Sequence, residues 1–174
     1  MITAAQWKSL LWLKPTDFRH PDKLQWSIVR ALDAFIFQVG SKPKVISDWR
    51  PFDSAAKTTQ QHPKGYAIDT DWGFEDPVII WEKMRSSRLF SGMGVYRNQL
   101  GVVTFHTDTR VERTVQDPAL WGVFITYPYN PATGTVVRHD QFVAADAVID
   151  VLKKKGTIVA LMVGTLLFVI LKKL

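Results

Sequence analysis

The chain has 174 residues, of which 47% are hydrophobic and seven are tryptophan, a composition that favours a globular domain over a disordered chain. No cysteine is present, which excludes a disulfide framework and thiolate metal ligands. Five of the 22 basic residues lie in 153–174, where no acidic residue occurs, so residues 1–152 hold 17 basic groups against 16 acidic ones. The formal net charge of +6 therefore does not indicate a nucleic-acid partner, and none is expected.

Two helices are predicted at the start of the chain. Residues 3–13 predict a short helix that ends before Pro15, and Lys8 interrupts its apolar run, so we do not interpret it as a signal peptide. Residues 21–39 predict an amphipathic helix that ends at Gly40. Its apolar residues recur at spacings of three and four: Leu24, Ile28, Leu32, Phe35 and Ile36.

The rest of the chain predicts short strands, loops and two further helices. A strand is predicted at 44–47, and the polar residues 51–64 after it predict a long loop. Asp76 and Pro77 predict the start of a helix, and the glycines of 92–96 lead into a strand. The remaining predicted elements are a hairpin turn at 97–101, strands at 102–110 and 120–125, and a helix at 140–152.

The stretch from Gln60 to Asp71, Q-Q-H-P-K-G-Y-A-I-D-T-D, holds the first two candidate metal ligands. His62 precedes a Pro-Lys-Gly turn, and Asp69 lies in the short alternating strand that follows the turn. A turn and a strand can bring an imidazole and an inward-facing carboxylate to one point, which suggests a zinc site. The alternative is a surface histidine beside a turn aspartate, because zinc needs at least three protein ligands.

His106 and Asp108 supply a candidate for the missing ligand. They lie two residues apart in the strand predicted at 102–110, so both side chains project from the same face. His106 is the candidate third ligand, and Asp108 places a carboxylate beside it. Without cysteine, a metal site in this chain must be built from such histidines and carboxylates.

Five segments occur in a fixed order along the chain. They are S-D-W-R at 47–50, Q-x-H-P-K-G-Y-A-I-D at 60–69, G-M-G-V-Y at 92–96, F-H-T-D-T-R at 105–110, and Trp121. In this order they resemble the zinc D-Ala-D-Ala carboxypeptidase and peptidoglycan endopeptidase family, which shares its fold with the hedgehog signalling domain. The resemblance covers residues 20–122. Gln60 stands where the family usually has serine, and Asp48 where it usually has glycine.

The resemblance implies a fold and a ligand set. The fold would be α+β and hedgehog/DD-peptidase-like, a small antiparallel sheet with flanking helices, forming a zinc peptidase-like domain over 1–152. His62, Asp69 and His106 would bind Zn²⁺ and leave its fourth position to water. Zinc would then activate that water for attack on an amide.

The resemblance also implies roles for residues around the ligands. Asp108 would act as the general base or would orient a ligand imidazole, and both roles stay open. Arg50 would bind a substrate carboxylate or stabilise an oxyanion, with an ion pair to Asp48 or Asp53 as the alternative. Tyr96 and Trp121 are expected in the core, and a Tyr96 hydroxyl near the metal is the alternative for that residue.

An uncharged apolar run occupies residues 156–171, between lysine clusters at 153–155 and 172–173. A helix over this run is about 24 Å long, and lysines that reach the interface help it match a hydrocarbon core of about 30 Å. The run therefore predicts one C-terminal transmembrane helix, a single-pass anchor over 153–174 with a lipid membrane as partner. The lysines on both flanks leave its orientation open.

Activity and location follow as expectations. The protein would be a zinc metallopeptidase that cuts the stem peptide or the cross-link of peptidoglycan, and we favour endopeptidase action, because an immobilised enzyme needs an open groove. Since no secretion signal is predicted, we hypothesise a lytic enzyme in the membrane of a lipid-containing bacteriophage or in the host inner membrane, beside other virion proteins. Absence of the protein from purified particles of a viral source would contradict a role in entry. The alternatives are a catalytically inactive peptidoglycan-binding protein and a structural membrane protein of such a phage.

Overall fold

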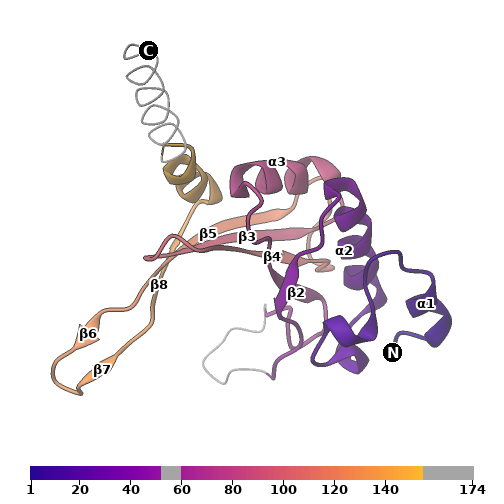
Figure 1. Cartoon of the computed structure of the whole chain (residues 1–174), viewed down its shortest axis with the longest axis horizontal. Coiled ribbons are helices and arrows are strands. Elements are labelled where there is room, and N and C mark those ends of the chain that lie inside the picture. The colour runs from indigo at the N-terminus through magenta and orange to yellow at the C-terminus, as the bar shows by residue number, and fades with distance from the viewer. Residues whose placement is uncertain (52–59, 155–174) are drawn as a thin grey trace, which may run out of the picture.

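The computed structural model describes residues 1–51 and 60–154, which form an α+β fold (Figure 1). Six strands build the main sheet: β1 Lys44–Ser47, β2 Ala67–Asp71, β3 Gly92–Asn98, β4 Val103–Asp108, β5 Ala119–Thr126 and β8 His139–Val143. Two short strands, β6 Tyr129–Asn130 and β7 Thr135–Val136, pair with each other. The helices are α1 Ala4–Lys8, α2 Trp26–Val39, α3 Pro77–Ser87 and a last helix over 145–154, with 3-10 turns at Pro15–Asp17 and Pro21–Lys23.

The main sheet is mixed, which corrects the predicted antiparallel sheet. Its order is β1-β2-β4-β3-β5-β8, and every neighbouring pair is antiparallel except β3 and β5, which are parallel. β2 already occupies the second edge of β4, so β5 joins the sheet at the free edge of β3. Because β5 follows β4 and reverses direction once, it runs the same way as β3.

The longest helix, α2, begins five residues later than predicted, at Trp26. The residues before it contact the loop that carries His62, because the backbone N–H of Gln25 donates a hydrogen bond to the carbonyl oxygen of Gly65 at 2.9 Å. The helix ends as predicted at Gly40, which has a φ of 84° that favours glycine. Its buried face consists of Ile28, Val29, Ala31, Leu32, Asp33, Phe35 and Ile36.

Helices pack against one face of the main sheet. Alternate strand residues such as Ile68, Val95 and Phe105 join the core with α2, α3 and the helix over 145–154. In Figure 1 α3 and this last helix lie above the sheet. Gly122 lets the last helix approach β5, because a Cβ at this position would lie 2.6 Å from Val148 Cγ2. The other face of the sheet is left for polar side chains, and the candidate site lies there.

Asp33 ties the N-terminal segment to α2. It is a buried charged residue, and its carboxylate accepts hydrogen bonds from the backbone N–H groups of Leu11, Trp12 and Leu13 at 2.8 to 3.0 Å. α1 stops short of the predicted residue 13, because the chain leaves the helix to make these bonds.

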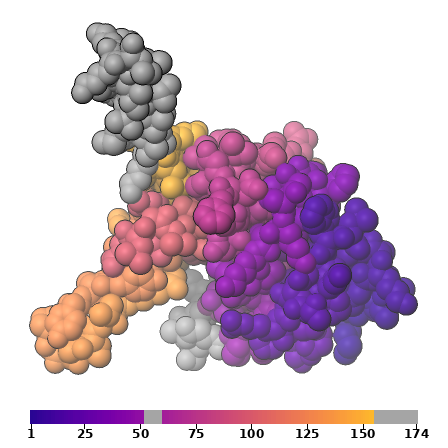
Figure 2. Space-filling view, in the orientation of Figure 1, coloured from indigo at the N-terminus to yellow at the C-terminus, as the bar shows by residue number. Residues whose placement is uncertain are grey.

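The β6–β7 hairpin projects from the sheet between β5 and β8, and in Figure 2 it is the orange lobe at the lower left. Tyr129 on β6 pairs with Val136 on β7. Both side chains are more than half exposed. Tyr129 is therefore a surface residue on a projection from the main sheet.

The predicted C-terminal anchor and the membrane location need correction. Among residues 1–51 and 60–154, no helix is long and apolar enough to cross a membrane. Residues 156–171, on which the transmembrane helix was predicted, lie outside the described residues. The predicted boundary between 152 and 153 falls inside the helix over 145–154.

Candidate metal centre

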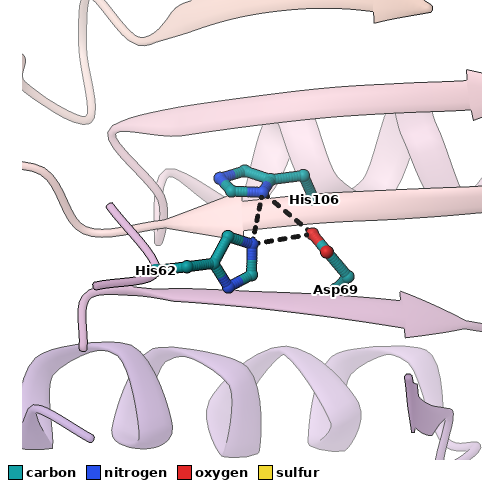
Figure 3. Close-up of side chains that lie close together, drawn as sticks. All are labelled: His62, Asp69 and His106. Atoms are coloured by element: carbon teal, nitrogen blue, oxygen red, sulfur yellow. Dashed lines mark hydrogen bonds and ion pairs between the residues drawn. The ribbon is translucent and has the colours of Figure 1, made fainter. Parts of the chain in front are cut away.

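The three side chains predicted as metal ligands meet on the face of the sheet opposite the helices (Figure 3). His62 Nε2 lies 3.2 Å from Asp69 Oδ1 and 3.2 Å from His106 Nδ1. The third side of this triangle, from His106 Nδ1 to Asp69 Oδ1, is 2.9 Å. In Figure 3 the three side chains point toward one another from the turn before β2, from β2 and from β4.

These distances fit a metal ion. Ligand atoms about 2.0–2.1 Å from a tetrahedrally coordinated ion lie about 3.3–3.4 Å from one another. The three donor atoms need to separate by only a few tenths of an ångström to reach that spacing. The buried cluster of His62, Asp69 and His106 could therefore hold a metal ion.

The sheet register positions two of the three donors. Asp69 on β2 is directly opposite His106 on β4 in an antiparallel pair, so both side chains lie on the same face. On β3, Gly94 is opposite His106 and has no side chain, so the Trp121 ring occupies the space above this residue. The sequence pattern predicted the face of each residue separately, and the pairing of β2 with β4 brings them together.

His62 is positioned by the turn between it and β2. Its carbonyl accepts a hydrogen bond from the Gly65 backbone N–H at 3.0 Å, and Trp49 Nε1 donates to the Pro63 carbonyl at 3.0 Å. Gly65 has a φ of 76°, and a Cβ there would lie 2.1 Å from the Lys23 carbonyl oxygen. Only glycine fits this turn, because both the backbone conformation and the contact exclude a side chain.

Each imidazole has its outward nitrogen hydrogen-bonded, so the inward nitrogen is the one that can bind a metal ion. His62 Nδ1 lies 2.5 Å from the carbonyl oxygen of Asp48, so we assign the proton to Nδ1. His106 Nε2 lies 3.0 Å from Asp108 Oδ2, so its proton is assigned to Nε2 when the ring is neutral. Such outer partners orient metal-ligating histidines and raise their basicity.

The cluster is reached from solvent on the side of Asp69. The side chains of His62 and His106 are 3% and 7% exposed, whereas that of Asp69 is 18% exposed. The two imidazoles are therefore fixed in the interior, and the carboxylate forms the edge of the site.

Without a metal, the cluster is held together by charge. Burial alone would raise the pKa of Asp69, but its contacts with the His106 and His62 rings outweigh burial and hold this pKa well below its ordinary range. Burial alone would lower the pKa of His106, but Asp108 and Asp69 raise it to about 9. At neutral pH the metal-free His106 therefore carries a proton on both ring nitrogens. A metal ion would displace the proton on Nδ1.

Asp108 has the geometry of an orienting residue. It is fully buried, and besides its bond to His106 its two oxygens accept bonds from Arg110 Nε at 2.8 and 3.1 Å and a further bond from Nη2. Burial would raise the pKa of Asp108, but the bonds to Arg110 and His106 lower it to about 2. Gly92 makes room for this carboxylate, because a Cβ there would lie 2.3 Å from Asp108 Oδ1. Of the two roles left open, these contacts favour orientation of His106 over general-base catalysis.

Arg50 is exposed. Its charge and that of Asp69 both act on the Tyr96 hydroxyl. No ion pair joins Arg50 to Asp48 within the described part of the chain, where the Asp48 carboxylate bonds to the His20 ring at 3.0 Å and to two backbone N–H groups. The predicted role of Arg50 in substrate binding stays a prediction.

Comparison with family models, with curated proteins and with solved structures finds no match for this chain. The resemblance to the zinc peptidase family therefore rests on the sequence motifs alone.

Two contacts that shape the site were not predicted from the sequence. Arg110 binds Asp108, and its position two residues further along the chain is the signal that could have indicated this contact. Asp48 holds His62 through its backbone carbonyl, for which the sequence carries no signal. The Asp48 side chain instead anchors His20, so the residue links the loop before α2 to the site.

Proposed function

We propose that this protein is a zinc-dependent peptidoglycan peptidase. The observation that carries the proposal is the convergence of His62 Nε2, Asp69 Oδ1 and His106 Nδ1, each within 3.2 Å of the others. Two imidazoles and one carboxylate are a donor set of catalytic zinc sites, which keep a further coordination position open. The five motifs support peptidoglycan as the substrate, because their order resembles that of zinc peptidases acting on the cell wall.

The donor chemistry supports zinc over Mg²⁺ and Ca²⁺. Imidazole nitrogen suits zinc, whereas Mg²⁺ and Ca²⁺ prefer sites made of oxygen ligands. The outer hydrogen bonds of His62 and His106 strengthen this preference, because they make the ligating nitrogens more basic.

Bound zinc would supply the Lewis acidity that activates water and polarises a carbonyl group. Residues of the chain would orient a zinc ligand and supply a positive charge that binds the substrate. Asp108, held by Arg110, would keep the His106 imidazole in the ligating tautomer. Arg50 would bind a carboxylate of the stem peptide through two parallel hydrogen bonds.

A zinc-holding protein that binds peptidoglycan without cutting it is the second candidate. The observation that favours it is the environment of Asp108, whose oxygens already accept bonds from His106 and Arg110. A carboxylate held in this way is poorly placed to take a proton from water. The two candidates share the metal centre and differ in whether a peptide bond is cut.

The test is digestion of defined muropeptides by the zinc-loaded full chain. The wild type is expected to release D-alanine or to expose new amino groups in cross-linked muropeptides. His106→Ala is expected to bind zinc at least about 100-fold more weakly and to lose activity, because it removes a ligand. The matched control is His139→Ala on β8, an exposed histidine outside the cluster, which is expected to keep both properties.

The outcomes separate the two candidates. A wild type that binds zinc and is retained on purified peptidoglycan, yet leaves every muropeptide intact, would favour the second. A wild type that binds zinc no better than His106→Ala would contradict both.

A further inference from the structure

The face that carries the cluster continues across β3 and β5. His106 on β4 is opposite Gly94 on β3, and Gly94 is in turn opposite Trp121 on β5. Tyr96 lies two residues beyond Gly94, so its side chain projects from the same face as His106. Trp121 and Tyr96 are therefore the neighbours of the cluster on this side.

The lack of a side chain at Gly94 lets the Trp121 ring lie against His106. A Cβ at Gly94 would be 2.5 Å from Trp121 Cε2, and the ring centroids of Trp121 and His106 are 5.0 Å apart. Trp121 Nε1 donates a hydrogen bond to the Tyr96 hydroxyl oxygen at 3.1 Å. Because that oxygen accepts from Trp121, the hydroxyl proton of Tyr96 is left to donate elsewhere.

The Tyr96 hydroxyl lies within the electrostatic field of the site. Burial and the charge of Asp69 raise the pKa of Tyr96 to about 12, against opposing effects of Trp121 and Arg50. A tyrosine keeps its proton at neutral pH even at its ordinary pKa of about 10. Tyr96 is therefore a neutral hydrogen-bond donor on which the charges of both Asp69 and Arg50 act.

We propose that the Tyr96 hydroxyl donates a hydrogen bond to the carbonyl oxygen of the scissile amide while that oxygen carries negative charge. The inference rests on the proposed peptidase function and adds a catalytic residue to it. Trp121 is a positioning residue, because it acts through its bond to Tyr96.

In amide hydrolysis this donor would stabilise the negative carbonyl oxygen that forms when water attacks. Water oxygen forms a bond to the carbonyl carbon, the C–N bond then breaks, and one proton of the water leaves with the amine. The carbonyl oxygen is negative only between these two events, so a donor aimed at it lowers the barrier more than it tightens substrate binding. Tyr96 keeps its own proton throughout.

The experiment compares zinc-loaded wild type, Tyr96→Phe and Trp121→Phe. Tyr96→Phe keeps the ring and is expected to lower kcat about 100-fold, with KM and zinc affinity unchanged. Trp121→Phe, which removes the indole N–H donor together with part of the ring, is expected to lower kcat about 10-fold, and adding it to Tyr96→Phe should cost little more. Tyr129→Phe on the projecting hairpin is the matched control and is expected to leave kcat unchanged.

A second readout does not depend on turnover. A phosphinate analogue of D-Ala-D-Ala carries an anionic oxygen that stands in for the oxyanion, and its affinity is measured by calorimetry. Tyr96→Phe is expected to weaken this affinity by a factor similar to its loss in kcat. An active wild type with a Tyr96→Phe variant of equal kcat and equal phosphinate affinity overturns the role of Tyr96 alone. A zinc-loaded wild type that cuts no muropeptide overturns the proposed function, and this inference with it.

Discussion

The His106 imidazole is buried between the carboxylates of Asp69 and Asp108, and this arrangement governs how the metal-free protein responds to pH. Both carboxylates raise the pKa of His106 to about 9, above the unfolded value of about 6.5. A raised pKa means that the folded state binds the proton more tightly than the unfolded chain does. The stabilisation is therefore fully present below pH 6.5 and is lost as the pH rises through 9.

We expect the EDTA-treated protein to be less stable at pH 9.5 than at pH 6, by on the order of 3 kcal/mol. On the acid side, Asp108 has a lowered pKa of about 2, so its stabilisation is lost below pH 4. Urea unfolding at several pH values measures the loss of stability at the alkaline end (the alkaline limb) and at the acid end of the stability–pH curve. His106→Gln should flatten the alkaline limb and His139→Gln should not. An alkaline limb that is the same in His106→Gln would show that the proton lies elsewhere.

Single-residue chemistry explains which parts of the site could be predicted. His62, Asp69 and His106 could be selected because few side chain types bind metals and the chain has no cysteine. The choice between two roles for Asp108 could not be made, because it depends on Arg110 occupying its oxygens. The Asp48 carbonyl that holds His62 could not be found, because every residue carries the same backbone atoms.

The strands β3, β4 and β5 pack closely at the site, because glycines on β3 make room for side chains of both neighbouring strands. Gly92 accommodates Asp108 from β4, and Gly94 accommodates Trp121 from β5. The spacing of two puts both glycines on the face that carries the cluster. The G-M-G segment could be recognised from the sequence as a motif, but the reason for it requires the parallel pairing of β3 with β5, which was predicted wrongly.

Gly94→Ala is expected to destabilise the protein by about 1–3 kcal/mol, because the new Cβ would overlap the rigid Trp121 ring. A double-mutant cycle with Trp121→Ala tests this cause directly, with urea unfolding as the measurement. In the Trp121→Ala background the overlap is gone, so Gly94→Ala should change stability by less than about 0.5 kcal/mol. Equal losses in the two backgrounds would show that the glycine is required for another reason.

Across the whole molecule, the two faces of the main sheet have different roles. One face joins α2, α3 and the helix over 145–154 in a continuous core, and the other carries the cluster. The apolar periodicity of α2 predicted its buried face, because that pattern is local. The strand order could not be predicted in the same way, because it depends on which edges are free once β2 has paired with β4.

Asp33 joins the N-terminal segment to this core, so its loss should be felt by the whole molecule. Its carboxylate accepts from the backbone N–H groups of three successive residues, 11–13. Asp33→Asn removes the charge and turns an amide N–H₂ toward backbone donors that then lack an acceptor. We expect a loss of about 2–4 kcal/mol in the free energy of unfolding.

Urea unfolding followed by tryptophan fluorescence measures this loss, with Asp22→Asn as the matched control. Asp22 is exposed and pairs only with its exposed neighbour Lys23 at 3.5 Å among the interactions that the structure describes, so its change should stay within about 0.5 kcal/mol. Zinc affinity in folded Asp33→Asn should match the wild type, because Asp33 belongs to the helical side of the sheet and the cluster to the other. Equal stability of the Asp33 and Asp22 variants would mean that the three backbone N–H groups find water as readily as they find the carboxylate, and that the N-terminal segment is held by its apolar contacts with α2 instead.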